Sequence, residues 1–358
     1  MERTKIAEHA ALLERLPSPD QMDKRELVDL LLREEYGYLP PAPDSVEVET
    51  VSVEKSGWFA GKAVYSHLMF HCKGSFGEFS FPVQYVCPKV EEKKKLPAFV
   101  HINFHSQLPN RFQPTEEIID HGYALLHFCY EDISSDDGDF TNGLAGVVYP
   151  NGKREARQCG KIGLWAWAAL RVIDYAMTLP ELDSCHISVA GHSRLGKTAL
   201  LTGALDERLF CAISNDSGCC GAALSRENTG ETLAAICKRF PYWFSEHYLQ
   251  YVDREEELPF DQHYLLAANY PHRVYVASAD ADAWACPKNE FLSSLAASEY
   301  YRARGMTGLI CGDEMPVIGD SFQEGCIAYH LRAGTHFMSR EDWNLYCRYL
   351  DAHKVVKK

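Results

Sequence analysis

The strongest constraint on the fold of this chain is the alternation of short apolar runs with helical segments. The runs 96–104 and 123–130 contain no Lys, Arg, Asp or Glu, which is typical of strands buried on both faces. The pattern continues through expected helices at 162–179 and 195–205 and expected strands at 186–190, 211–215 and 273–278. Such alternation predicts an α/β fold, with a mostly parallel central sheet covered by helices on both faces.

Two further segments set the expected domain organisation. Leucines at helical spacing in 24–36, followed by Gly37 and three prolines, predict an N-terminal helical extension over 1–45. Residues 46–358 then form one catalytic domain, in which about 219–271 is a lid-like insertion. The aromatic residues of the segment "FPYWFSEHYLQY" in this insertion either line a pocket or form the core of the lid itself.

Composition restricts the possible partners and the compartment. The 36 Lys and Arg against 50 Asp and Glu give a net charge of −14, which argues against nucleic-acid and anionic-membrane partners. The first twenty residues lack the apolar core of a signal peptide, and no stretch is long enough to cross a bilayer. Thirteen scattered cysteines without a C-x-x-C pair predict neither a metal site nor disulfides. We therefore expect a cytoplasmic protein; its oligomeric state is left open.

The segment "GHSRLGKT" is compatible with two different sites. As a phosphate loop it would place Lys197 on nucleotide phosphates and Thr198 on magnesium. As a nucleophile elbow it would present Ser193 on a tight turn between a strand and a helix. The variable positions of the loop are bulky, and the segment follows two expected buried strands, so nucleotide binding remains only a remote alternative.

An elbow serine needs an acid and then a histidine further along the chain. Asp216 and Asp282 each follow an expected strand, and His336 precedes the last expected helix. This order makes Ser193 the candidate nucleophile and His336 the base that activates it. One feature departs from the common elbow, because Leu195 stands where a glycine is usual and the glycine comes one residue later.

The displaced glycine is part of a wider resemblance. "GHSRLGK" resembles the G-C-S-R-x-G-K signature of the glucuronoyl esterases, carbohydrate esterase family 15. The blocks "NDSGCCGAALSRENTGETL", "ASADADAWACPKNEF" and "YHLRAGTHFMSREDW" are similar to successive parts of bacterial members, which are often labelled acetylxylan esterases. The similarity covers about residues 96–350. His192 replaces the cysteine of the signature, and the acidic residue that often follows the histidine is missing.

The resemblance implies an α/β-hydrolase fold and ester hydrolysis through an acyl-enzyme, without cofactor or metal. It implies that the Arg194 backbone N–H binds the oxyanion and that its side chain assists. Two acids compete to orient His336: Asp282 has the usual position in α/β-hydrolases, and Asp216 has the position that some glucuronoyl esterases use. We favour Asp282.

The substrate implied is a small carbohydrate ester, first a glucuronoyl or 4-O-methyl-glucuronoyl ester and alternatively an acetylated sugar. Lys197, Glu231 and Trp284 resemble sugar-contacting positions, although Glu231 is equally explained as a helix cap and Trp284 as a core aromatic. Arg194 and Lys197 place two positive charges near the nucleophile of an acidic protein, which we take to favour the uronate. A catalytically inactive carbohydrate-binding relative is a further alternative.

Overall fold

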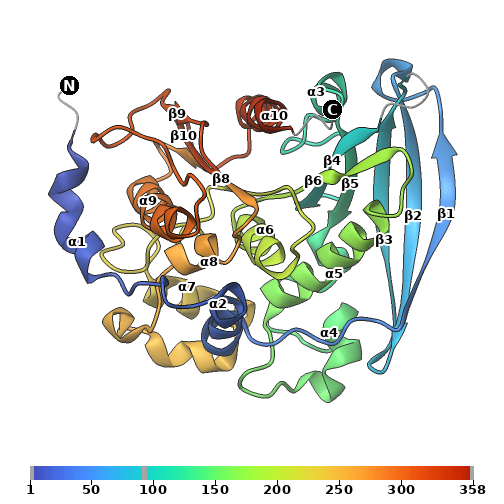
Figure 1. The fold of residues 1–358 in the computed structure, drawn as a ribbon. Coiled ribbons are helices and arrows are strands. Elements are labelled where there is room, and N and C mark those ends of the chain that lie inside the picture. Colours follow the sequence, from blue (N-terminus) through green and yellow to red (C-terminus); the bar gives the residue numbers. More distant parts are fainter. Residues whose placement is uncertain (1–3, 91–94, 355–358) are drawn as a thin grey trace.

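The computed structural model describes residues 4–90 and 95–354, which are built around one ten-stranded sheet (Figure 1). The strand order is β1-β2-β3-β5-β4-β6-β7-β8-β10-β9. Six neighbouring strands are parallel: β5 (Ala124–Cys129), β4 (Leu96–Asn103), β6 (Leu182–His192), β7 (Cys211–Asn215), β8 (Arg273–Ala279) and β10 (Ile327–Arg332). The predicted mostly parallel sheet is therefore confirmed.

Antiparallel strands extend the sheet at both edges. They are β1 (Ser45–Glu54), β2 (Ala63–Gly74) and β3 (Gly77–Pro88) at one edge and β9 (Ser321–Phe322) at the other. Every residue of β4, β5, β7 and β10 is buried, whereas β1 is largely exposed. The apolar runs identified in the sequence are thus the central strands, whose two faces both pack against helices. β2, β3 and β10 were not identified from the sequence.

Helices cover both faces of the sheet (Figure 1). One face packs against α5 (Lys161–Ala176), α6 (Arg194–Leu205) and α9 (Pro287–Ala303), and the other against α3 (Thr115–Asp120) and α10 (Arg340–His353). Trp165 of α5 and Trp343 of α10 are almost completely buried, one in each layer of the core. The short helices elsewhere are η3 (Phe59–Gly61), η4 (Tyr130–Asp132), α4 (Gly143–Val148) and η5 (Pro150–Gly152).

The N-terminal segment contains η1 (Ile6–His9), α1 (Ala10–Arg15), α2 (Lys24–Leu31) and the π-helical turn η2 (Leu32–Tyr36), and β1 begins at Ser45. This segment packs on the insertion. The Tyr36 hydroxyl donates a hydrogen bond to the Cys220 carbonyl at 2.7 Å, and the Gln262 amide donates to buried Glu35 at 3.2 Å. The helical extension therefore supports the part of the chain that was predicted to be a lid.

The chain between β7 and β8 forms α7 (Leu233–Arg239), η6 (Pro241–Trp243), η7 (Glu246–Tyr251), η8 (Glu255–Glu257) and α8 (His263–Ala267). Its aromatic residues serve both purposes considered above. Phe244 and Tyr248 are fully buried in the core, whereas Phe240 and Trp243 line a pocket. No helix in the described parts of the chain combines the length and the apolar character needed to span a membrane.

Candidate active site

Ser193 occupies a strained turn between β6 and α6. Its backbone has φ 58° and ψ −127°, a conformation that residues other than glycine rarely adopt. A side chain at Gly191 would place its Cβ 2.1 Å from the Leu195 carbonyl oxygen, so the turn needs glycine there. This local geometry is that of a nucleophile elbow, which holds the serine away from both flanking elements.

The position of the second glycine also has a physical reason. Leu195 is fully buried, and its side chain belongs to the core beside α6. A Cβ at Gly196 would lie 3.0 Å from Ser214 Oγ and 3.0 Å from Ser217 Cβ. The close approach between the helix and the neighbouring strand end thus falls at position 196 in this chain.

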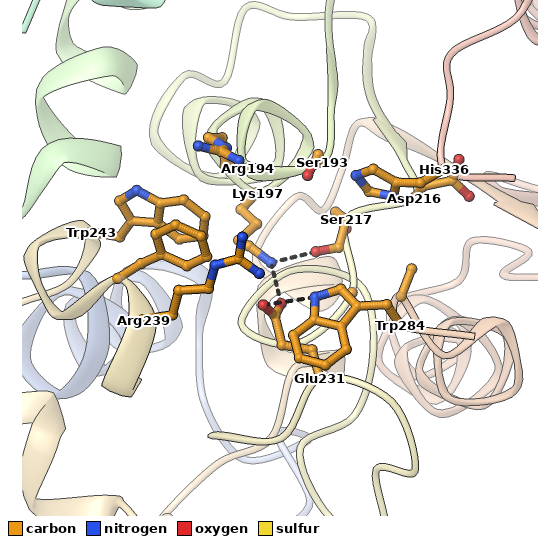
Figure 2. Close-up of a pocket in the computed structure, with 13 residues that line it drawn as sticks. Ser193, Arg194, Lys197, Asp216, Ser217, Glu231, Arg239, Trp243, Trp284 and His336 are labelled. Carbon is orange, nitrogen blue, oxygen red and sulfur yellow. Dashed lines mark hydrogen bonds and ion pairs between the residues drawn. The ribbon is translucent and has the colours of Figure 1, made fainter. Parts of the chain in front are cut away.

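His336 lies on the loop between β10 and α10, and in Figure 2 its imidazole faces Ser193. Its Nδ1 is 2.6 Å from Oδ2 of Asp282, which follows β8 and is 4% exposed. With Nδ1 donating to the carboxylate, Nε2 is left to accept a proton from the serine. The sequence separates these three side chains by up to 143 positions, and the fold brings them together at the carboxyl ends of the parallel strands.

Asp216 is the second carboxylate near His336, but its contacts differ. Its Oδ1 accepts from the Ala279 N–H at 2.8 Å, and its Oδ2 accepts from Arg332 at 3.2 Å and from the Phe337 N–H at 3.4 Å. Burial is the main cause that raises its pKa well above the ordinary range, Glu290 adds to the rise, and Arg332 opposes it. Asp216 therefore holds the backbone beside His336, whereas Asp282 contacts the ring.

A buried acid that the sequence analysis did not identify supports this region. Glu290 of α9 accepts hydrogen bonds from the Gly218 N–H at 2.9 Å and from the Ser278 hydroxyl at 2.5 Å. Burial raises the pKa of its fully buried carboxyl to about 7. Nothing in its sequence context distinguishes it from a surface glutamate on a helix, so only the packing of α9 reveals it.

Glu290→Gln should make the free energy of unfolding less dependent on pH. In the unfolded chain the Glu290 pKa is near 4.5, and in the folded protein it is about 7. Its stabilising contribution is therefore fully present below about pH 4.5 and is lost as the pH rises through about 7. The amide does not ionise: its oxygen accepts from the Gly218 N–H, and its NH2 donates to the Ser278 hydroxyl oxygen. At pH 8 the variant should therefore be more stable than the wild type by about 3 kcal/mol.

Urea unfolding of both proteins between pH 4.5 and 8 measures this difference. The two curves of unfolding free energy against pH should converge at the acid end. A constant offset across the range would contradict a proton held by Glu290 in the folded state.

The Arg194 side chain turns away from solvent towards the insertion. Its guanidinium forms an ion pair with Asp136 and lies 4.7 Å from the Trp243 ring centroid and 5.3 Å from that of Phe240. As the first residue of α6, Arg194 has a backbone N–H without an acceptor in the preceding turn of the helix. That N–H belongs to the residue next to Ser193, and it is placed to bind the oxyanion that would form on an ester carbonyl attacked by the serine.

Lys197 lies in the pocket but is only 2% exposed. Its ammonium donates to the backbone carbonyls of Ser217 and Cys219 and lies 3.6 Å from the Glu231 carboxylate. Because Arg194 is paired with Asp136 and Lys197 with Glu231, the net excess of positive charge inferred from these two residues is absent. The argument for the uronate from an excess of positive charge is therefore wrong. The sequence could not reveal this pairing, because both partner carboxylates come from distant parts of the chain.

Most of the candidate residues line one pocket (Figure 2). Its volume is about 580 Å³, including the part that is open to solvent. Seven of the eight predicted site residues line it, and Asp282 contacts His336. Trp284 is 47% exposed, and its indole N–H donates to Glu231 at 3.0 Å, so it is not a core aromatic. Thr232 caps α7, so Glu231 is not the helix cap. Both structural alternatives considered for these residues are wrong.

The family model described as glucuronyl esterase, fungi, matches residues 72–305. The chain belongs to the glucuronoyl esterase family. The resemblance inferred from the sequence is thus confirmed.

Individual relatives agree with this assignment. The carbohydrate esterase MZ0003 from an unknown prokaryotic organism is 40% identical over 240 residues, which are 66% of this chain and 55% of that protein. The glucuronoyl esterase from Solibacter usitatus superposes with a TM-score of 0.82 at 29% identity, covering 98% of this chain and 94% of the other. A promiscuous CE15 esterase from a marine bacterial metagenome gives 0.83 at 29%, covering 94% and 92%. The predicted α/β-hydrolase fold is confirmed, and the chain spans about half the length of the curated relatives it matches.

Membership in the glucuronoyl esterase family and the geometry together overturn the phosphate-loop interpretation. Lys197, whose positive charge would bind the phosphates, is buried, donates to two backbone carbonyls and is paired with the Glu231 carboxylate. The Thr198 hydroxyl, which would bind magnesium, donates to the Arg194 carbonyl at 2.9 Å. The segment "GHSRLGKT" therefore matches the phosphate-loop pattern in the spacing of its residues but not in the contacts that they make.

Proposed function

We propose that this protein hydrolyses glucuronoyl esters of carbohydrates through an acyl-enzyme on Ser193. The observation that carries the proposal is the strained Ser193 elbow facing His336, whose Nδ1 lies 2.6 Å from buried Asp282. Relatives described as glucuronoyl esterases support the choice of ester.

The reaction follows from these positions. His336 Nε2 removes the Ser193 proton as the serine oxygen attacks the ester carbonyl, and Asp282 stabilises the imidazolium that forms. The Arg194 N–H stabilises the negative oxygen of the tetrahedral intermediate. His336 then gives the proton to the departing alcohol, and a water molecule activated in the same way releases the uronic acid. None of these steps uses a metal or a cofactor.

The polar side of the pocket is suited to a sugar ring. Two of the three Lys197 ammonium protons bind backbone carbonyls, which leaves one donor beside the Glu231 carboxylate. This donor and acceptor together match ring hydroxyls, and the exposed Trp284 ring provides an apolar surface for the sugar C–H groups. A uronate ester carries its carbonyl on the ring, so ring contacts position the carbonyl for attack.

The substrate experiment compares kcat/KM for benzyl glucuronate, acetylated xylose and p-nitrophenyl acetate. We expect glucuronate to be preferred, and Lys197→Ala to reduce its hydrolysis selectively by about ten- to a hundredfold, the effect of one charged hydrogen bond. Glu231→Gln is the matched variant, because it keeps the shape of the side chain while removing the charge. Better hydrolysis of the acetyl esters, with both variants affecting all substrates alike, would favour an acetyl esterase instead.

An inactive carbohydrate-binding protein is the remaining alternative, and covalent labelling separates it from an esterase. A fluorophosphonate probe should label wild-type protein at Ser193. Absence of labelling in folded protein would contradict the proposed chemistry.

We further propose that the protein works in a reducing compartment, the cytoplasm being the simplest case. Nine of the thirteen cysteines are buried with their thiols outside any disulfide. The Sγ atoms of Cys219 and Cys220 lie 3.7 Å apart, at hydrogen-bond distance and not joined as a disulfide. Finding the bulk of the native protein outside the cell, or linked by intermolecular disulfides, would contradict this proposal.

A further inference from the structure

Arg239 lines the same pocket, although the proposed reaction does not use it. It is the last residue of α7 in the insertion, and its side chain is exposed. Figure 2 shows the guanidinium extending into the pocket on the side of Trp243, across the Lys197–Glu231 pair from His336. Because His336 gives the proton to the departing alcohol in the proposed reaction, Arg239 lies on the other side of the pocket from the position expected for that alcohol.

Arg239 differs from the other two basic residues of the pocket in having no carboxylate partner. Arg194 is paired with Asp136, and Lys197 with Glu231. Within residues 4–90 and 95–354, no carboxylate oxygen lies within the 4.0 Å of an ion pair with Arg239. Its positive charge therefore faces the pocket unneutralised.

The aromatic residues beneath Arg239 restrict where its guanidinium lies. The guanidinium carbon is 5.1 Å from the Phe240 ring centroid. The Phe240 ring is stacked on Trp243, with centroids 3.8 Å apart and an interplanar angle of 3°. A guanidinium supported on one face keeps its N–H groups at the edge, where they fit the two oxygens of a carboxylate.

We infer that Arg239 binds a carboxylate on the carbohydrate part of the substrate, carried by a sugar other than the esterified one. The inference rests on the proposed function. The carboxyl group of the esterified uronate is neutral and lies at Ser193, so it does not satisfy Arg239. A free uronate on a neighbouring sugar supplies the missing negative charge. The preferred substrate is then an acidic oligosaccharide in which one carboxyl is esterified and another is free.

The test uses two matched disaccharides. Each contains benzyl glucuronate; the second sugar is glucuronate with a free carboxylate in one and glucose in the other. Wild-type protein should hydrolyse the acidic disaccharide with a kcat/KM about five- to tenfold higher, a modest factor because the arginine is partly solvated. Arg239→Gln should abolish this preference while leaving the neutral disaccharide unaffected, and added salt should weaken it in the wild type.

Lys238→Gln is the control, because it removes the same charge from the neighbouring exposed position, which does not line the pocket. It should keep the preference. Equal losses on both disaccharides in Arg239→Gln would overturn the inference. A third ester, with glucose as the second sugar and a para-carboxyl group on the benzyl alcohol, checks the position of the charge. An equal preference for this ester would also overturn the inference. Hydrolysis of the neutral disaccharide without any preference would overturn this inference alone. Failure to hydrolyse either ester would overturn the proposed function as well.

Discussion

Ser193→Ala and His336→Ala should each lower kcat for glucuronate ester hydrolysis by about 10⁴-fold or more, and the double variant should lose little beyond either single one. The reason is that the serine attacks only while the histidine accepts its proton, so removing either side chain removes the same step. The strained backbone of Ser193 and the orientation of His336 towards it are the observations behind this expectation.

Single-turnover and steady-state rates on benzyl glucuronate measure the losses. Thermal unfolding of each variant is the control, because alanine at the half-buried Ser193 and at the exposed His336 should leave the fold intact. Losses that multiply in the double variant would show that the two residues do not share a step. The remaining activity of the single variants also gives the contribution of the Arg194 N–H and of substrate binding.

Asp282→Asn should lower kcat by about 10²- to 10⁴-fold, whereas Asp216→Asn should act mainly on stability. Asparagine at 282 presents an N–H to His336 and so favours the wrong imidazole tautomer. Asp216 instead accepts hydrogen bonds from Ala279, Phe337 and buried Arg332, and we expect its replacement to cost about 1–3 kcal/mol of unfolding free energy.

Kinetics and urea unfolding of both variants separate the two roles. The expected result is a large kcat loss with little change in stability for Asp282→Asn, and the opposite balance for Asp216→Asn. The reverse ordering of kcat would assign the orienting role to Asp216. Similar small losses in kcat would mean that the two carboxylates replace one another, which their proximity to His336 allows.

Much of the architecture was predictable because burial on both faces of a parallel sheet demands continuous apolar runs. β4, β5 and β7 have this pattern, and each is fully buried. β2 and β3 lack such runs, since their buried residues alternate with exposed or half-exposed ones. The six buried residues of β10 include His330 and Arg332, whose polar groups are satisfied by Asp342.

The sequence by itself determined the elbow, the order of serine, acid and histidine, and the family, since each depends on neighbouring residues or on the order of strand ends. Only the tertiary structure decided which charges are neutralised and which acid contacts His336. Asp136 reaches Arg194 from 58 positions away, and Asp282 reaches His336 from 54 positions away. Arg239, the last residue of α7, likewise shares a pocket with Ser193 only through the packing of the insertion. Ion pairing depends on distances between side chains, and these are set by how the insertion and the strand ends pack rather than by local sequence.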